Sequence, residues 1–324
     1  MRVKIGITVG DPAGIGPEIA RKAAGHPDVR ALCDVVFYGP IADADVAAFE
    51  RGRVSAAAGR AAYDAIVRAV DDAVHGKIDA IVTAPVNKEA FAAAGLPWRG
   101  HTDLLAHLTG APNVAMMFYA ESLRVVLATV HIALADVPRA ITREGIESVV
   151  ALTAASLPRF GIASPRLALA GLNPHAGEHG VIGREDDEIL APAVAACRAR
   201  GITIEGPLPA DTVFVRAMRG EYDCVVACYH DQGLIPVKLV AFGRAVNVTL
   251  GLPIVRTSVD HGTAFDIAGK GIADPSSLIE AIKLAVRLVP TSRSTDVAGS
   301  SPQRAERSEG MAGDGGGAPS QGKK

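Results

Sequence analysis

The chain has 324 residues and a formal net charge of −2 with its histidines counted as neutral. Hydrophobic residues make up 49% of it and charged residues 21%, which is typical of a globular protein with one large α/β domain or two moderate ones. The near balance of charge gives no field for nucleic acid, and no run of about eighteen apolar residues is present to span a membrane.

The N-terminus and the cysteines indicate a cytoplasmic protein. Met1 and Arg2 lead directly into a strand pattern, without the apolar segment of a signal peptide. Cys33, Cys197, Cys224 and Cys228 are scattered, as in a reducing compartment, rather than arranged as a disulfide framework. Cys224 and Cys228 could form a zinc site with His230, but a buried strand also uses small apolar cysteines, and we favour that interpretation.

The first hundred residues alternate between strand and helix patterns. Strands are expected at 3–9, 35–38 and 80–84, and a long helix at 55–74. The first strand leads into GDPAGIGPE (10–18), a glycine loop that opens a helix. This loop could present backbone N–H groups to an anion, but it matches neither the P-loop nor the GxGxxG fingerprint, and a structural turn explains it equally well.

Two motifs place polar side chains at expected helix starts. TAPVNK (83–88) makes Lys88 a candidate for a phosphate contact, although we favour a solvated lysine there. In GHTD (100–103), Thr102 or Asp103 can cap a helix that begins at Leu104. His101 and Thr102 could equally form an anion cradle at that helix start.

The rest of the chain continues as α/β layers and then changes character. Residues 115–119 and 123–131 are separated by the short Glu121-Ser122 connection and predict an antiparallel pair, hence a mixed sheet in a second subdomain. Further helices are expected at 142–160, 185–200 and 276–288. The segment 290–324 has almost no large apolar residues and is predicted to be disordered.

Three histidines each follow an apolar, strand-like run: His131, His175 and His230. Residues beyond the carboxyl ends of strands line the ligand crevice of an open α/β sheet. Three imidazoles there could hold one divalent cation, whereas a single histidine after a strand is usually structural, so the pattern leaves both interpretations open. Asn247, an amide inside an apolar run, needs a polar partner that a ligand could supply.

Seven segments between about residues 3 and 289 resemble those of the 4-hydroxythreonine-4-phosphate dehydrogenase family of pyridoxine biosynthesis. They are GDPAGIGPE (10–18), TAPVNK (83–88), GHT (100–102), GLNPHAGE (171–178), GPLPADT (206–212), YHDQGL (229–234) and LGLPIVRTSVDHGTAFDIAG (250–269).

The resemblance implies two α/β/α domains of the isocitrate and isopropylmalate dehydrogenase type, with mixed sheets and a cleft between the domains. Residues 1–103 with 256–289 would form the first domain, 104–255 the second domain with the dimer interface, and 290–324 the tail. It also implies a homodimer whose site lies at the subunit interface.

The resemblance further implies a role for each candidate site residue. Those implied to bind a divalent metal, among zinc, magnesium, cobalt, manganese and nickel, are His131, His175 and His230. Those implied to contact the substrate are His101, Thr102, Lys238, Asn247 and Arg256. Those implied to contact NAD or NADP are His261, Gly262, Thr263, Ala264 and Asp266. The general base stays open among Asp211, Asp231 and Lys238.

The implied reaction is the oxidation of the secondary alcohol of 4-hydroxythreonine 4-phosphate to a β-keto acid, which loses carbon dioxide to give 3-amino-2-oxopropyl phosphate. A metal would lower the pKa of the reacting hydroxyl. The alternatives are a D-threonate or D-erythronate 4-phosphate dehydrogenase, a metal-dependent phosphate-ester hydrolase, and a non-catalytic phosphometabolite-binding protein. The last two leave DHGTAFDIAG (260–269) unexplained, and GHT favours a phosphorylated substrate.

Overall fold

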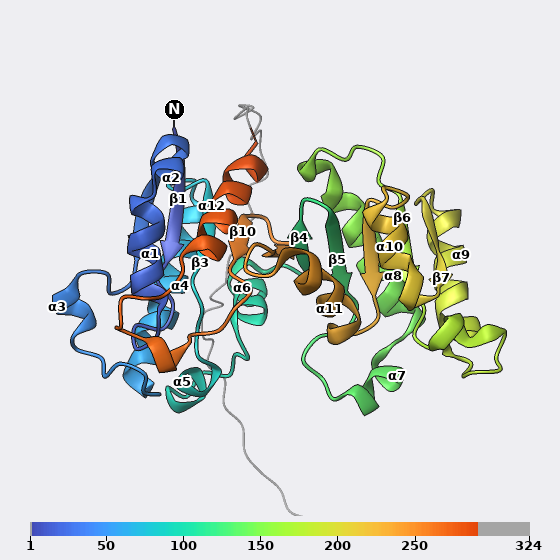
Figure 1. The fold of residues 1–324 in the computed structure, drawn as a ribbon, viewed down its shortest axis with the longest axis horizontal. Helices are drawn as coiled ribbons and strands as arrows, with labels where there is room; N and C mark the ends of the chain where they lie inside the picture. The colour runs from blue at the N-terminus through green and yellow to red at the C-terminus, as the bar shows by residue number, and fades with distance from the viewer. Residues whose placement is uncertain (1, 291–324) are drawn as a thin grey trace, which may run out of the picture. The chain divides into compact units, whose positions relative to one another are not determined.

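Strands and helices alternate along the chain and build one mixed sheet (Figure 1). The computed structural model describes residues 2–290, which form one compact unit. The predicted disordered tail therefore lies outside the described residues beyond Pro290. Within these residues the strand order is β2-β1-β3-β10-β9-β4-β5-β8-β6-β7. The strands are β1 (Val3–Thr8), β2 (Cys33–Tyr38), β3 (Ala80–Thr83), β4 (Ala115–Ala120), β5 (Leu123–Leu127), β6 (Leu167–Ala170), β7 (Ile204–Leu208), β8 (Cys224–Ala227), β9 (Val246–Leu250) and β10 (Val255–Ser258).

The strand directions follow from the connections. Only two residues join β4 to β5, and these strands are antiparallel, as predicted. Strand β9 is antiparallel to both of its neighbours, β10 and β4. The remaining pairs are parallel. The α/β class and the mixed sheet are thus confirmed, with the antiparallel strands at the centre. The sheet runs through both predicted domains, and the division into domains stays a prediction.

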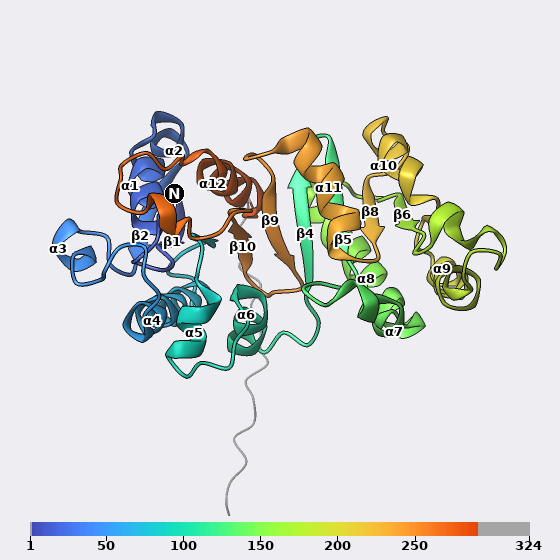
Figure 2. The same ribbon diagram turned by 60° about the horizontal axis from the view of Figure 1, so that its bottom comes forward.

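The helices cover both faces of this sheet (Figures 1 and 2). They are α1 (Gly16–Gly25), α2 (Pro27–Leu32), α3 (Asp43–Val46), α4 (Ala56–Val74), α5 (Lys88–Ala93), α6 (His101–Thr109), α7 (Val137–Ala140), α8 (Arg143–Ser156), α9 (Ala191–Ala199), α10 (Ala210–Met218), α11 (His230–Ala241) and α12 (Ser276–Leu288). None of these helices is long and apolar enough to cross a membrane.

Polar residues fix several helix starts as their sequence positions suggest. The Ser55 hydroxyl accepts a hydrogen bond from the N–H of Ala58 at 3.1 Å and caps α4. The Asn87 amide oxygen accepts from the N–H of Ala90 at 2.8 Å and caps α5. These bonds satisfy donors that have no partner within the helix, so they define where each helix begins.

Three clusters of buried apolar side chains hold the layers together. The largest packs α1, α2, α8, α9 and α12 on one side of the strands. On the other side, one cluster packs α4, α5 and α6 against β2 and β3, and another packs α10 and α11 against β4, β5, β6 and β8. The closing helix α12 lies against α1 and α2. Between the last two clusters, β9 and β10 present polar side chains.

Two sequence expectations near the centre are wrong. The strand expected to reach His131 ends at Leu127, because its parallel partner β8 ends at Ala227. The helix expected to begin at Leu104 begins at His101, and neither Thr102 nor Asp103 caps it. The Asp103 carboxylate instead accepts a hydrogen bond from the N–H of Arg99, in the preceding loop.

The contact between α4 and α5 gives a stability prediction. A Cβ on Gly59 of α4 would lie 2.1 Å from the Ala90 carbonyl oxygen. Alanine gains about 1 kcal/mol of helix propensity over glycine, but overpacking against backbone costs about 1–3 kcal/mol. Because α5 would have to move, the overpacking cost should be about 3 kcal/mol, and we expect Gly59→Ala to lower the free energy of unfolding by a net of about 2 kcal/mol in urea titrations.

Gly25→Ala is the matched control, because a Cβ there would meet nothing within 4 Å. It should leave the free energy of unfolding unchanged or slightly raised. Equal effects of the two substitutions would contradict the proposed close contact.

Candidate active site

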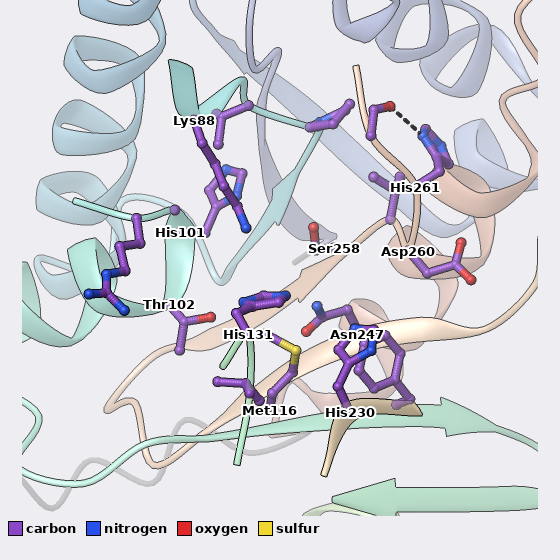
Figure 3. A pocket seen from close by; sticks show the side chains of 18 of the residues that line it. Lys88, His101, Thr102, Met116, His131, His230, Asn247, Ser258, Asp260 and His261 are labelled. Carbon is purple, nitrogen blue, oxygen red and sulfur yellow. Dashed lines mark hydrogen bonds between the residues drawn. The ribbon is translucent and has the colours of Figure 1, made fainter. Parts of the chain in front are cut away.

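A cavity of about 630 Å³ lies over β4, β9 and β10, between α6 and α11 (Figure 3). Its floor is the polar part of the sheet, and its walls carry the first residues of both helices. The residues used below that line it are Lys88, His101, Thr102, His131, His230, Lys238, Asn247, Arg256, Ser258, Asp260, His261 and Gly262.

Ser258 and Asn247, which line the cavity, belong to a row of polar side chains set by strand register. Thr83 pairs with Thr8 on one side and with Ser258 on the other, and Ser258 pairs with Asn247. Paired residues point to the same side of a sheet, so this row crosses four strands. The Thr83 hydroxyl donates to the Ser258 hydroxyl at 2.9 Å. A polar row here separates the two apolar clusters on this side of the sheet.

Arg256 is a buried cation in this floor, with 2% of its surface exposed. Its guanidinium donates to the Thr83 hydroxyl at 2.7 Å and to the Thr249 hydroxyl at 2.9 Å. Within residues 2–290 no carboxylate pairs with it, and burial lowers its pKa to about 9. It therefore stays charged at neutral pH, and an anion in the cavity would stabilise it.

Three buried polar atoms around the cavity lack a partner: His101 Nε2, Asn247 Oδ1 and Arg256 Nε. Buried polar atoms are nearly always hydrogen-bonded, and a missing bond costs about 1–3 kcal/mol. Burial, followed by the nearby charge of Arg256, holds the pKa of His101 well below its usual value, so the ring is neutral. The three atoms offer a donor, an acceptor and a tautomeric group to a polar ligand.

His131 and His230 lie side by side, with ring centroids 5.5 Å apart (Figure 3). His230 is the first residue of α11, and its Nδ1 lies 2.7 Å from Asp231 Oδ1, which leaves Nε2 free. Burial, then the charges of Lys88 and His230, lowers the pKa of His131. Neutral imidazoles are the form that binds metal ions.

His175 does not join this pair within one chain. It follows β6 as predicted, but it does not line the cavity. In the described part of the chain, no three His, Cys, Asp or Glu side chains lie close enough to hold an ion. This also applies to the alternative zinc site of Cys224, Cys228 and His230. One chain therefore offers two imidazoles to a cation.

Three of the predicted metal or cofactor residues have left-handed backbone conformations. His131 has a φ of 51°, His175 a φ of 53° and Ala264 a φ of 43°. Such values are uncommon for residues other than glycine and persist only where surrounding contacts enforce them. All three residues belong to the predicted metal or cofactor set.

Of the three candidates for a general base, one lines the cavity and two lie outside it. Lys238 lines the cavity. Asp231 is the hydrogen-bond partner of His230, and its side chain is mostly exposed. Asp211, on α10, lies with Asp231 in a separate hollow of about 480 Å³ between α10 and α11. Only Lys238 reaches the cavity from within this chain.

The 261–273 loop forms one end of the site. His261 and Gly262 line the cavity, whereas Thr263, Ala264 and Asp266 lie farther along the loop. The loop contains only a short 3-10 turn (η5, Phe265–Ile267). It leads back to α12 at Ser276.

Lys88 is exposed, as the favoured interpretation predicts, and it also lines the cavity, where its charge lowers the pKa of His131. Two further lining residues were missed in the sequence. Ser258 and Asp260 line the cavity as well. Polar residues at the end of a buried strand, in TSVDHG (257–262), were the available signal.

The buried neutral His101 predicts a pH dependence of stability. Its pKa is lower in the folded than in the unfolded chain, so unfolded chains bind the proton more readily below about pH 6.5. Stability should therefore be full above this pH and fall below it, by at most about 1.4 kcal/mol per pH unit for one proton. Urea titrations at several pH values should show a smaller fall in His101→Gln.

His131 has a lowered pKa of the same sign, so some slope should remain in this variant. A His107→Gln control, on an outer turn of the same helix, should keep the wild-type slope. Equal slopes in all three proteins would contradict the neutral, buried state of His101.

Comparison with known proteins places the chain among dehydrogenases. The sequence profile of the family described as "Pyridoxal phosphate biosynthetic protein PdxA" matches residues 18–285. The chain is 47% identical over 321 residues to D-threonate 4-phosphate dehydrogenase of Cupriavidus necator, covering 88% of this chain and 96% of that protein. It is also 47% identical over 322 residues to 4-hydroxythreonine-4-phosphate dehydrogenase of Beijerinckia indica, covering 89% and 96%.

Solved structures agree with these relatives. The crystal structure of 4-hydroxythreonine-4-phosphate dehydrogenase from Klebsiella pneumoniae has a TM-score of 0.80 and 42% identity, covering 89% of this chain and 98% of that one. Isocitrate dehydrogenase from Methylococcus capsulatus, at 18% identity and a TM-score of 0.50 over 88% and 85%, shares the fold. The family and fold predicted from the motifs are confirmed: the chain belongs to the pyridoxal phosphate biosynthetic protein PdxA family.

Proposed function

We propose that the protein is an NAD(P)-linked dehydrogenase that oxidises the secondary alcohol of 4-hydroxythreonine 4-phosphate. The observation that carries this proposal is the buried guanidinium of Arg256, without a carboxylate partner, beside the unsatisfied atoms of His101 and Asn247. A small substrate with two anionic ends and hydroxyl or amino groups between them would satisfy all three. The dehydrogenase names of the relatives support the reaction class.

The cavity has two positively charged regions, one at Arg256 and one at Lys88, and each suits one anionic end of the substrate. The phosphate suits the start of α6, where backbone N–H groups and the Thr102 hydroxyl lie near Arg256. The carboxylate suits Lys88, which no carboxylate of residues 2–290 pairs. In this orientation the hydroxyl that reacts lies between the two ends, toward His131 and His230.

We propose that the two histidines belong to a divalent cation site completed by His175 of the partner subunit. His131 and His230 are close and have neutral or free nitrogens, so they suit such an ion, but two protein ligands make an incomplete set. When bound, the cation would stabilise negative charge that develops on the reacting oxygen. Asp231 would hold the His230 ring in the tautomer that binds the ion.

Exposed apolar side chains on α10 and α11 support the homodimer that this site requires. Leu239 is 82% exposed, Phe242 81% and Ile235 59%, and Val215 and Met218 lie beside them. Contiguous apolar surface of this kind is typical of a subunit interface. It adjoins His230, so a partner seated there would close the cavity from the side of α11.

The proton of the alcohol needs an acceptor in the cavity, and we propose that Lys238 accepts it. Lys238 lines the cavity from the last turn of α11, with its Nζ 5.9 Å from the centre of the Phe242 ring. The C–H bond of the carbinol carbon breaks with its electron pair leaving as hydride, which the nicotinamide accepts when bound. The β-keto acid then loses carbon dioxide. His261 to Asp266 would contact the dinucleotide.

D-threonate 4-phosphate is the second candidate substrate, because the relative that carries this name is as similar as the one named for 4-hydroxythreonine 4-phosphate. The two substrates differ only at C2, which carries an amino group in one and a hydroxyl in the other. Asp260 gives the cavity a carboxylate that could accept from an ammonium group, and this favours 4-hydroxythreonine 4-phosphate.

The substrate is tested by following reduced nicotinamide with each phosphorylated acid, NAD or NADP, and a divalent ion. We expect kcat/KM to be at least about tenfold higher for 4-hydroxythreonine 4-phosphate, since an unpaired polar partner is costly. The opposite preference would assign D-threonate 4-phosphate. No reduction with either acid, with or without phosphate release, would contradict the proposed reaction.

Mixing inactive variants tests the shared cation site. A dimer of one His131→Ala chain and one His175→Ala chain would keep one complete site of two. Co-expression should yield such dimers as half of the total, and hence about a quarter of wild-type turnover.

The pair His131→Ala and His230→Ala is the control, because both residues come from the same chain in the proposed site. Their mixed dimer has no complete site and should stay inactive. Recovery in this control, or no recovery in the first mixture, would contradict the contribution of the partner's His175.

A further inference from the structure

The GDPAGIGPE motif (10–18) follows β1 and opens α1, but none of its residues lines the cavity. Several of its backbone donors are already used within the protein. The N–H groups of Asp11 and Gly14 donate to Pro85 and Asp11 carbonyls, and that of Ala13 donates to the Asp11 carboxylate at 2.9 Å. These three N–H groups are therefore not available to an anion.

The last of these donors reaches the 261–273 loop. The N–H of Ile15 donates to the carbonyl oxygen of Thr263 at 3.0 Å. A Cβ on Gly14 would lie 2.8 Å from that same oxygen and 2.9 Å from the Thr263 Cβ. Only glycine at position 14 permits this approach, so the motif and the loop are in direct backbone contact.

Two charged residues of α1 hold the far end of the same loop. The Glu18 carboxylate, 7% exposed, accepts from the N–H groups of Ala273 at 2.8 Å and Gly271 at 3.3 Å. The Lys22 ammonium donates to the carbonyl oxygens of Gly271 at 2.9 Å and Ala273 at 2.8 Å, and to Glu18 at 2.8 Å. The Glu18–Lys22 ion pair thus binds both the backbone N–H and the backbone carbonyl of Gly271 and of Ala273.

A third contact comes from Gly52. Its N–H donates to the Ala13 carbonyl at 2.8 Å, and a Cβ there would lie 2.7 Å from the Phe265 carbonyl oxygen. The φ of Gly52 is 70°, which also favours glycine. The loop is therefore contacted at Thr263, at Phe265 and at 271–273, all by residues of the first sixty.

The loop has little structure of its own to maintain its shape. Its internal backbone bonds are those of one short turn, from Ile267 to Ala264, Ala268 to Phe265 and Lys270 to Ile267, at 3.1 to 3.4 Å. Ala264 also adopts a left-handed φ of 43°. A conformation with strained backbone and few internal bonds must be imposed by its surroundings.

We propose that Gly14, Glu18 and Lys22 are positioning residues for the dinucleotide, acting through the 261–273 loop that they hold in its binding conformation. The proposal rests on the assignment of this loop to NAD or NADP in the proposed function. The glycine motif and α1 act without touching the cofactor. A loop held in advance binds its ligand without first losing conformational entropy, so loosening it weakens binding.

Two substitutions release the loop by different means. Glu18→Gln removes the charge that pairs with Lys22 and leaves one acceptor oxygen where the carboxylate had two. Gly14→Ala displaces Thr263 sterically and leaves the ion pair intact. For each we expect the KM for the dinucleotide to rise about tenfold, with the KM for the phosphorylated substrate within about twofold of wild type.

Hydrogen exchange gives a readout without cofactor or turnover. In the dimer without nucleotide, amides of 261–273 should exchange about tenfold faster in both variants than in the wild type. Exchange in β1 and α12 should stay unchanged, which shows that the fold is retained.

Matched controls separate this effect from a general loss of stability. Glu147→Gln removes a buried carboxylate that pairs with Arg143 at 2.7 Å on α8, in the same i,i+4 arrangement. Gly25→Ala adds a Cβ at the end of α1 that meets nothing. Neither control should change loop exchange or the KM for the dinucleotide.

The proposal is overturned if loop exchange is unchanged in both variants, if it quickens without a rise in the KM for the dinucleotide, or if both KM values rise together. Failure of the proposed function has a different result. The wild type would then show no reduction of either dinucleotide, whereas the hydrogen-exchange comparison would still report whether α1 holds the loop.

Discussion

The buried charge of Arg256 is the constraint on which the centre of this structure depends. A cation removed from water costs free energy unless polar groups surround it, and here two threonine hydroxyls from neighbouring strands do so. The polar side chains of β9 and β10 lie between the two apolar clusters on this side of the sheet. Stability alone would favour an apolar residue at this position. A cation that no carboxylate of residues 2–290 pairs is what the proposed anionic substrate requires of this position.

The strand directions place the remaining groups around this charge. The antiparallel strands at the centre separate the α4–α6 group from the α10–α11 group, so a helix from each bounds the cavity. Both helices begin at a histidine: α6 at His101 and α11 at His230. Their starts carry partial positive charge, and the guanidinium of Arg256 adds a full positive charge. The cavity therefore favours anions at several points, which suits a substrate with a phosphate and a carboxylate.

Local patterns predicted much of this fold, and non-local contacts account for the failures. Caps such as Ser55 and the apolar periodicity of 55–74 and 276–288 are local signals, and these helices were predicted closely. The end of β5 depends instead on β8, about a hundred residues later, so sequence around 128–131 could not reveal it. The hydroxyl partners of Arg256 follow from strand register, since Thr83 is 173 residues away. Strand ends and motif resemblance identified His175 as a candidate, but neither could show that it lies away from the cavity that His131 and His230 line in one chain.

The contacts between α1 and the 261–273 loop connect two distant parts of the sequence in the proposed binding of the dinucleotide. Glu18 and Lys22 bind backbone atoms of Gly271 and Ala273, so these contacts do not depend on which side chains the loop carries. The side chains that these contacts need are those of Glu18 and Lys22, four residues apart on α1. Gly14, just before the helix, is needed as well because it has no Cβ. The side chains of the loop can therefore vary to suit a ligand, because contacts with α1 hold the loop backbone in one conformation. In the proposed function, the recognisable motif thus lies at the N-terminus and the dinucleotide contacts lie some 250 residues later.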